Sequence, residues 1–220
     1  LGMSRGLGDV YKRQDKHFTP SYNPWEQRMC LIPNSDFFNA IKDKSATVVT
    51  DHIEAFEENG IKLKSGDFLE ADIIVTATGL VLQNFGGVNI SVNNNPVNVS
   101  ETMTYKSLMY SDIPNFVNSF GYINASWTLK ADLTSTYLCR LIKHMDQNNY
   151  LSACPKKPLD VDETYDWLKD FSSGYIQRSI GLHPQQGSKK PWVNYQDYIK
   201  DWFDVKFSKL EDGNLVFSKD

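Results

Sequence analysis

Residues 71–80, with the sequence ADIIVTATGL, are the stretch on which the predicted fold depends. Apolar and β-branched side chains follow Asp72 without a further charge, which is typical of a strand buried on both faces of a parallel α/β sheet. Gly79 lets the backbone turn sharply at the carboxyl end of that strand. In doubly wound sheets such strand ends are where cofactors lie. The pattern alone fits an ordinary core strand equally well.

The composition is that of a globular protein of one or two domains, with 220 residues of which 40% are hydrophobic. Lysine and arginine number 23 against 27 acidic residues, which gives a formal charge of -4 without a basic stripe. This balance excludes nucleic acid as an expected partner. The sequence contains neither an apolar run of roughly 20 residues nor an export signal. We therefore expect a cytoplasmic protein without a transmembrane segment.

Cysteines and histidines indicate neither a disulfide framework nor a metal site. Cys30, Cys139 and Cys154 are far apart and odd in number, and no C-x-x-C pair occurs. The four histidines are scattered, without an HExxH or i,i+4 pattern. We expect no bound metal.

The chain before residue 80 divides into three predicted pieces. Residues 1–14 (LGMSRGLGDVYKRQ) have no apolar period and resemble translated adaptor sequence, so they are left out of the predicted fold. Residues 15–33 are rich in proline and aromatic residues and predict a rigid extended loop. A helical turn at 36–41 follows, and strands at 46–56 and 61–63 around an Asn-Gly turn then form a meander leading into residues 71–80.

The clearest helix follows a strand-like segment at 116–122. Apolar residues recur at three- and four-residue steps from Leu129 to Met145, and asparagines end the pattern. Beyond residue 150, prolines mark a linker, residues 162–171 predict an acidic helix, 174–187 a loop, and 191–203 an aromatic-rich helix.

Three features could carry chemistry together. They are the strand end at Thr78 and Gly79, the start of the long helix at Trp127 and Thr128, and Arg28 in the rigid loop. Unpaired N–H groups at a helix start can hold an electron-accepting ring oxygen such as that of a flavin, although an ordinary capped helix explains the same residues. An arginine is charged at every working pH and can stabilise a developing oxyanion, but such a residue is also commonly a surface ion pair.

The sequence resembles the carboxyl-terminal half of class B flavoprotein monooxygenases, and most of all the Baeyer-Villiger enzymes of the ethionamide-activating kind. The resemblance lies in HFTPSYNPWEQRMCLIPNSDFF (17–38), VVTDHIEAFEENGIKLKSGDFLEADIIVTATGL (48–80) and GYINASWTLKADL (121–133). It implies an α/β fold that is the last part of a flavoprotein with two Rossmann-like dinucleotide-binding domains and incomplete sheets. The implied organisation is the end of the NADPH-binding domain with the active-site loop at 15–45, the last part of the FAD-binding domain at 46–150, and a carboxyl-terminal extension at 151–220.

The resemblance also implies an activity and its residues. NADPH would reduce FAD, O₂ would add to the flavin to form a peroxyflavin, and one oxygen atom would enter a ketone or a sulfur compound. Arg28 matches the family's active-site arginine. Thr78 and Gly79 match the strand end that returns to FAD, and Trp127 and Thr128 match the helix start beside the flavin.

Two family features are missing from the sequence. It contains no G-x-G-x-x-G loop and no F-x-G-x-x-x-H-x-x-x-W fingerprint. We therefore expect a fragment that by itself binds neither FAD nor NADPH tightly and is inactive. Two alternatives stay open: an amine- or sulfur-oxidising flavin monooxygenase without ketone activity, and a non-catalytic remnant.

Overall fold

The structure is a computed structural model that describes residues 16–20, 22–23, 32–123, 125–157, 162–164 and 173–220. Contacts divide the chain into two compact units. Unit 1 contains the described residues up to Thr78, and unit 2 contains those from Gly79 onward.

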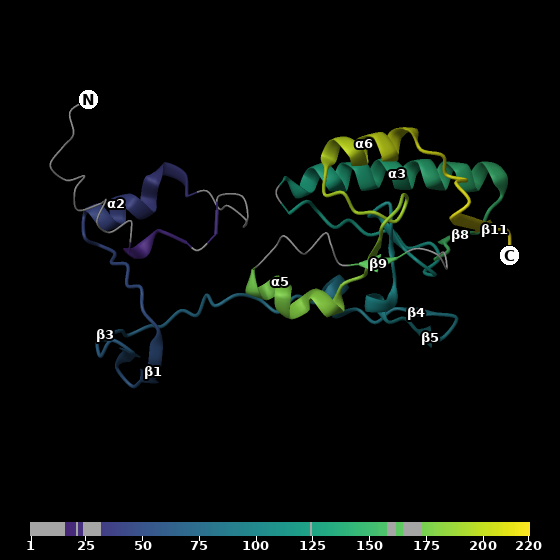
Figure 1. The fold of residues 1–220 in the computed structure, drawn as a ribbon. Helices are drawn as coiled ribbons and strands as arrows, with labels where there is room; N and C mark the ends of the chain where they lie inside the picture. The colour runs from purple at the N-terminus through teal and green to yellow at the C-terminus, as the bar shows by residue number, and fades with distance from the viewer. Residues whose placement is uncertain (1–15, 21, 24–31, 124, 158–161, 165–172) are drawn as a thin grey trace, which may run out of the picture. The chain divides into compact units, whose positions relative to one another are not determined.

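Helices and short strands alternate along the described residues (Figure 1). The helical elements are η1 (Pro33–Ser35), α2 (Asp36–Lys42), η2 (Asn84–Gly87), η3 (Val99–Glu101), α3 (Trp127–Asn148), α5 (Gly174–Ser179), η4 (Ile180–Leu182) and α6 (Tyr198–Phe207). The strands are β1 (Ile53–Glu57), β2 (Gly60–Leu63), β3 (Phe68–Glu70), β4 (Ser91–Val92), β5 (Asn95–Pro96), β6 (Thr104–Tyr105), β7 (Met109–Tyr110), β8 (Ser152–Pro155), β9 (Glu163–Thr164), β10 (Gln186–Gly187) and β11 (Leu215–Ser218).

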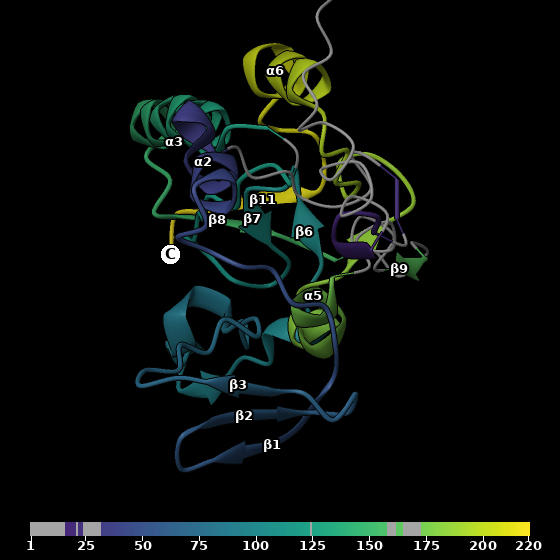
Figure 2. The same ribbon diagram turned by 90° about the vertical axis from the view of Figure 1, so that its left-hand side faces the viewer.

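Unit 1 is built on a three-stranded antiparallel sheet in the order β1-β2-β3 (Figure 2). Gly60 begins β2 with a φ of 156°, and a Cβ there would lie 2.1 Å from the carbonyl oxygen of Leu69. Only glycine therefore fits where β2 approaches β3. The predicted hairpin around the Asn-Gly turn is confirmed by the antiparallel pairing of β1 with β2, in which Glu57 lies opposite Gly60. The predicted strand 46–56 is confirmed only from Ile53, and the predicted helical turn at 36–41 is α2.

The prediction of a buried strand within residues 71–80 is wrong. None of these residues is in a strand, and Ile73 and Val75 are 81% and 82% exposed. β-Branched residues favour an extended backbone, but a strand exists only where a neighbouring strand offers its hydrogen bonds. Among the described residues, β3 ends at Glu70 and no strand pairs with the segment that follows. The mixture of helices and strands is as expected, but every pairing between these strands is antiparallel.

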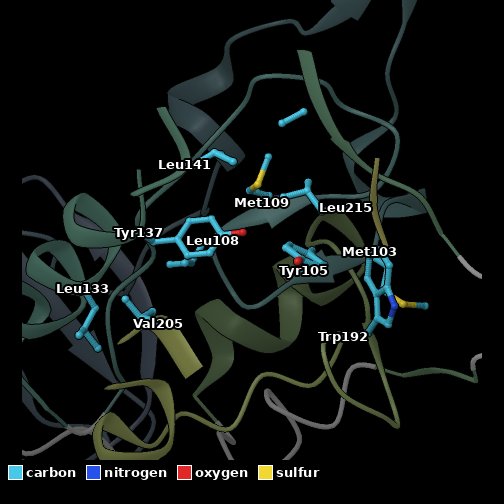
Figure 3. Close-up of a cluster of buried hydrophobic side chains, with 11 residues drawn as sticks. Met103, Tyr105, Leu108, Met109, Leu133, Tyr137, Leu141, Trp192, Val205 and Leu215 are labelled. Atoms are coloured by element: carbon cyan, nitrogen blue, oxygen red, sulfur yellow. The ribbon is translucent and has the colours of Figure 1, made fainter. Parts of the chain in front are cut away.

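Unit 2 has a core covered by α3 and α6, which lie side by side in Figures 1 and 2 and contact each other. The buried core consists of Met103, Tyr105, Leu108, Met109, Leu133, Tyr137, Leu141, Ala153, Trp192, Val205 and Leu215 (Figure 3). The rings of Tyr105 and Trp192 meet edge to face with centroids 5.5 Å apart, a preferred arrangement of aromatic pairs. The core therefore joins the β6-β7 hairpin to segments some 80 residues later.

The long predicted helix is confirmed as α3, and Asn149 ends it in the left-handed conformation with a φ of 57°. The predicted helix 191–203 is correct only in its second half, because α6 begins at Tyr198. The carboxylate of Asp197 accepts hydrogen bonds from the N–H groups of Ile199 and Lys200 at 2.9 and 3.1 Å, which fixes this start.

Other predictions in unit 2 need correction. Residues 116–122 are half-buried or buried but are not a strand, and 174–187 contains α5 and η4 rather than only loop. The acidic helix predicted at 162–171 falls mostly outside the described residues, and its described beginning contains strand β9. No helix in the described ranges is sufficiently long and apolar to traverse a lipid bilayer.

Candidate functional site

A cavity of about 340 Å³ lies within unit 2. Four segments that are distant in sequence form its walls. Its lining residues are 82–86, Thr104, Ser107, Tyr110, 118–120, Trp127, His183, Pro184 and Asn194. Trp127 is thus a residue that the sequence singled out and that the structure places in a cavity wall.

The β6-β7 hairpin forms one wall through a tight turn. Lys106 and Ser107 have φ values of 51° and 57°, and the N–H of Leu108 donates to the carbonyl of Tyr105 at 3.0 Å. Such turns normally contain glycine or asparagine, so two other residues here store backbone strain. The Lys106 ammonium helps hold the turn by donating to the Ser208 hydroxyl at 2.9 Å.

Two hydroxyl groups of this hairpin have no hydrogen-bond partner among the described residues. They are the Oγ1 of Thr104 and the Oγ of Ser107, both shielded from solvent. The Thr104 residue is only 5% exposed. Leaving a buried hydroxyl unpaired costs about 1–3 kcal/mol. The hairpin that forms this wall therefore holds two buried hydroxyl oxygens without a bond among the described residues.

A second wall is aromatic. The Phe85 ring contacts those of Tyr110 and Phe116 at centroid distances of 5.3 and 5.2 Å. The side-chain amide of Asn118 donates to the Tyr110 hydroxyl at 2.9 Å. Burial raises the pKa of Tyr110 to about 12, although the bond from Asn118 opposes this shift. Tyr110 therefore remains an uncharged hydroxyl at neutral pH.

Trp127 contributes a third wall at the start of α3. Its ring lies 5.3 Å from that of Phe120, which in turn meets His183 edge to face at 6.3 Å. Gly121 permits this packing, because a Cβ there would lie 2.2 Å from Cγ of Trp127. His183 is 4% exposed, and burial lowers the pKa of its imidazole below the usual 6.5. The histidine is therefore neutral at pH 7.

The first turn of α3 leaves backbone N–H groups without a partner inside the helix, as every helix start does. The Ser126 side chain does not cap them; its hydroxyl lies 2.7 Å from that of Thr128 instead. No acidic residue occupies the first turn. Its partial positive charge therefore stays available to a group that gains negative charge.

Gly79 reaches the same region of unit 2. Its φ is 101°, a backbone conformation that residues with a side chain rarely adopt. A Cβ at this position would lie 3.2 Å from Nη2 of Arg178. The same guanidinium donates to the carbonyl of Leu80 at 3.2 Å. Three residues after Gly79, Leu82 lines the cavity and packs with Ile123 against Ile176 of α5. The chain after Gly79 therefore leads to the cavity that Trp127 lines.

Two other residues that the sequence singled out, Arg28 and Thr78, are not among the described residues that line the cavity. Arg28 is outside the described residues, and Thr78 belongs to unit 1. The cavity contains functional candidates that sequence reasoning missed, namely Thr104, Ser107 and His183. No Asn-Gly pair marks this hairpin in the sequence, and nothing local pointed to His183.

Comparison with known proteins gives close relatives over most of the chain. It is 47% identical over 204 residues to AlmA of an Acinetobacter species, which carries the name "Probable FAD-binding monooxygenase", and to the FAD-containing monooxygenase EthA of Mycolicibacterium smegmatis. It is also 47% identical over 205 residues to EthA of Mycobacterium tuberculosis. These matches cover 93% of this chain but only 41–42% of the relatives.

No family model matches the chain. No solved structure matches it significantly. The resemblance inferred from the three sequence motifs is confirmed at the level of FAD-containing monooxygenases, since several such proteins align with nearly the whole chain. The chain corresponds to less than half the length of each of these relatives.

Proposed function

We propose that this chain is the carboxyl-terminal part of an FAD- and NADPH-dependent monooxygenase of the Baeyer-Villiger type. The intact protein inserts one oxygen atom from O₂ into a ketone, giving an ester or lactone, or oxygenates a sulfur compound. The observation that carries this proposal is the 47% identity to FAD-containing monooxygenases over 93% of the chain. The class of substrate comes from the sequence motifs around Arg28 and Trp127.

The start of α3 and the corner at Gly79 are suited to one edge of the FAD ring system. The uncapped first turn favours a ring oxygen that gains negative charge, and Gly79 lets a flat group approach the backbone without a side chain in the way. Trp127 and Thr128 would then flank the ring, with Thr78 preceding the corner. FAD supplies the activation of O₂ with electrons taken from NADPH.

Arg28 would supply a fixed positive charge. Negative charge develops on oxygen when the carbonyl carbon of a ketone is attacked, and a guanidinium stabilises that charge without a change of protonation. The aromatic cavity walls would exclude water from the substrate. His183, neutral at pH 7, adds no competing charge.

The chain contains no glycine-rich loop for the pyrophosphate of either dinucleotide. We therefore propose that the isolated chain of 220 residues binds neither FAD nor NADPH tightly and does not turn over substrate. Purification of this chain with excess FAD tests this point. A stoichiometric yellow flavin after gel filtration would contradict it.

The activity is tested in a full-length protein that contains this chain. Arg28→Ala is expected to abolish ester formation from a ketone while NADPH still reduces the flavin, and Arg28→Lys should restore part of the activity because the positive charge returns. Unchanged ester yield in Arg28→Ala would remove Arg28 from the mechanism. Oxygenation of a sulfide or amine without any ester from matched ketones would favour the alternative monooxygenase, and no NADPH oxidation at all would favour a non-catalytic remnant.

A further inference from the structure

From the exposed side of helix α6 we infer that unit 2 binds the surface of an anionic lipid membrane, with the aromatic side of this helix in the interface and a lysine on either side of it. The inference goes beyond the proposed function, because no residue of α6 lines the cavity and the surface requires neither FAD nor turnover. The helix lies on the outside of unit 2, where it packs on α3 (Figures 1 and 2).

An apolar stripe runs along the exposed side of α6. Ile199, Phe203 and Phe207 are 66%, 56% and 68% exposed. Their four-residue spacing places them on the same side of the helix, whereas Val205 on the opposite side is buried. The ring of Trp202 contacts the rings of Phe203 and Phe207 at centroid distances of 5.0 and 5.5 Å, so the three rings form one continuous surface. A contiguous apolar patch on the outside of a protein indicates an interaction site.

Lysines border this stripe on both sides. Because successive residues of a helix are turned by about 100°, Lys206 falls beside Ile199 at one edge of the stripe, and Lys200 falls beside Phe207 at the other. Both lysines are exposed. The Lys200 side chain stays 59% exposed although its ammonium lies 3.9 Å from the carboxylate of Asp197. The alkyl stems of such lysines can lie along an apolar surface while their ammonium groups stay at its rim.

The two carboxylates within α6 do not cancel this positive charge, because each is paired with a lysine from another segment. Asp201 lies 2.7 Å from the ammonium of Lys130, and Asp204 lies 2.8 Å from that of Lys190. Lys206 forms no ion pair with any of the residues that the structure describes. The exposed side of the helix therefore combines an apolar centre with positive edges.

A bilayer with anionic headgroups fits both properties. Helices that lie in a membrane interface typically carry aromatic side chains that reach below the headgroups and lysines that meet the lipid phosphates. A second copy of the chain fits less well. A symmetric dimer would bring the same stripe against itself and place Lys200 and Lys206 near the lysines of the other copy. Because α6 has only ten residues, we expect the binding to be reversible.

Flotation with lipid vesicles tests this inference on a full-length protein that contains this chain. The vesicles consist of phosphatidylcholine alone, or of phosphatidylcholine and phosphatidylglycerol in equal parts. Protein that rises with the vesicles in a density gradient is bound, whereas aggregated protein sinks. We expect the partition coefficient to be at least about tenfold higher for the anionic vesicles and to fall as salt is added.

Substitutions on α6 separate the apolar contribution from the electrostatic one. Phe203→Ser should lower the partition coefficient on anionic vesicles roughly tenfold. Lys200→Gln and Lys206→Gln should each lower it roughly fivefold and leave the weaker binding to neutral vesicles unchanged. Val88→Ser is the matched apolar control, because Val88 is 66% exposed and precedes β4, which lies across unit 2 from α6 (Figure 1). Lys64→Gln, at an exposed lysine of unit 1, is the charge control, and neither control should change binding.

Three outcomes would overturn the inference: no flotation with anionic vesicles, equal binding to neutral and anionic vesicles, or binding that Phe203→Ser and both lysine variants leave unchanged. Analytical ultracentrifugation tests the other occupant. A dimer that Phe203→Ser dissociates, without any vesicle binding, would assign the stripe to a second copy of the chain. The comparison of lipids and salts uses the unsubstituted protein, so it does not depend on the folding of a variant. Because no turnover is measured, each result leaves the monooxygenase proposal to its own test.

Discussion

The ammonium of Lys130 on α3 lies 2.7 Å from Oδ2 of Asp201 on α6, and the two side chains are 1% and 6% exposed. The hydroxyl of Tyr122 donates to the same carboxylate oxygen at 2.8 Å. The Lys130 ammonium also lies 5.5 Å from the centre of the Tyr122 ring. One carboxylate therefore links the two helices to the segment that leads into α3 and the cavity.

Removal of the lysine charge should strongly destabilise unit 2. Lys130→Met leaves the Asp201 carboxylate buried without its counter-charge, and breaking a buried pair in this way costs about 3–5 kcal/mol. Chemical denaturation followed by circular dichroism measures the loss. Lys143→Met removes an exposed lysine of the same helix and should change the free energy of unfolding by less than about 0.5 kcal/mol. Equal stability of the two variants would show that the ion pair does not hold α3 to α6.

Asp212 should make stability depend on pH in the acid range. Burial opposes ionisation of this carboxyl, but bonds from the Tyr105 hydroxyl and the backbone N–H groups of Asn214 and Leu215, with the charge of Lys106, outweigh it and hold its pKa below 3.8. The unfolded state then binds more protons as the pH falls below about 4, so the stabilisation is present at neutral pH and is lost in acid.

Asp212→Asn is accordingly expected to lower the free energy of unfolding by roughly 1–3 kcal/mol at pH 7. The difference from the original chain should shrink as the pH falls below 3.8, toward the lowered pKa of the folded state. Urea denaturation at a series of pH values measures it. Asp112→Asn, which removes an exposed partner of Lys156, should cost at most about 1 kcal/mol. A pH-independent effect of Asp212→Asn would show that its charge is not what matters.

Gly121 should be intolerant of even a methyl group. In Gly121→Ala the added Cβ would meet the Trp127 ring at 2.2 Å, so the ring must move away from the cavity wall. We expect a loss of about 1–3 kcal/mol and a changed near-ultraviolet spectrum of tryptophan. Gly181→Ala serves as control, because no atom lies within 4 Å of its added Cβ. Identical spectra of both variants would contradict the contact.

The start of α6 should depend on one carboxylate. Asp197→Ala removes the acceptor for the N–H groups of Ile199 and Lys200 and should cost about 1 kcal/mol. Asp197→Asn and Asp197→Ser keep an acceptor at the same place and should retain most of the stability. Thermal denaturation of the three variants measures these differences. An Asp197→Ala variant with unchanged thermal stability would show that Asp197 does not fix the start of the helix.

The sequence predicts secondary structure correctly where residues close together along the chain determine it. The apolar repeat of α3 and the Asn-Gly turn before β2 are both local signals, and both predictions are confirmed. The strand expected within 71–80 and the one expected at 116–122 required a partner strand that no local pattern can supply.

The candidate site shows the same contrast between local signals and long-range packing. Trp127 was identified because a helix start has its own signature. Thr104, Ser107 and His183 were missed because their meeting at one cavity depends on the packing of segments about 80 residues apart. The orphaned hydroxyls became visible only once their surroundings were known.

The exposed apolar segment around Ile73 and Val75 should affect the production of this polypeptide. Unpaired backbone groups beside β-branched side chains form a ready template for another copy of the same segment. We expect the polypeptide, expressed by itself, to collect in inclusion bodies and to recruit chaperones. A charged residue at Val75 should shift it to the supernatant without altering the core of unit 2.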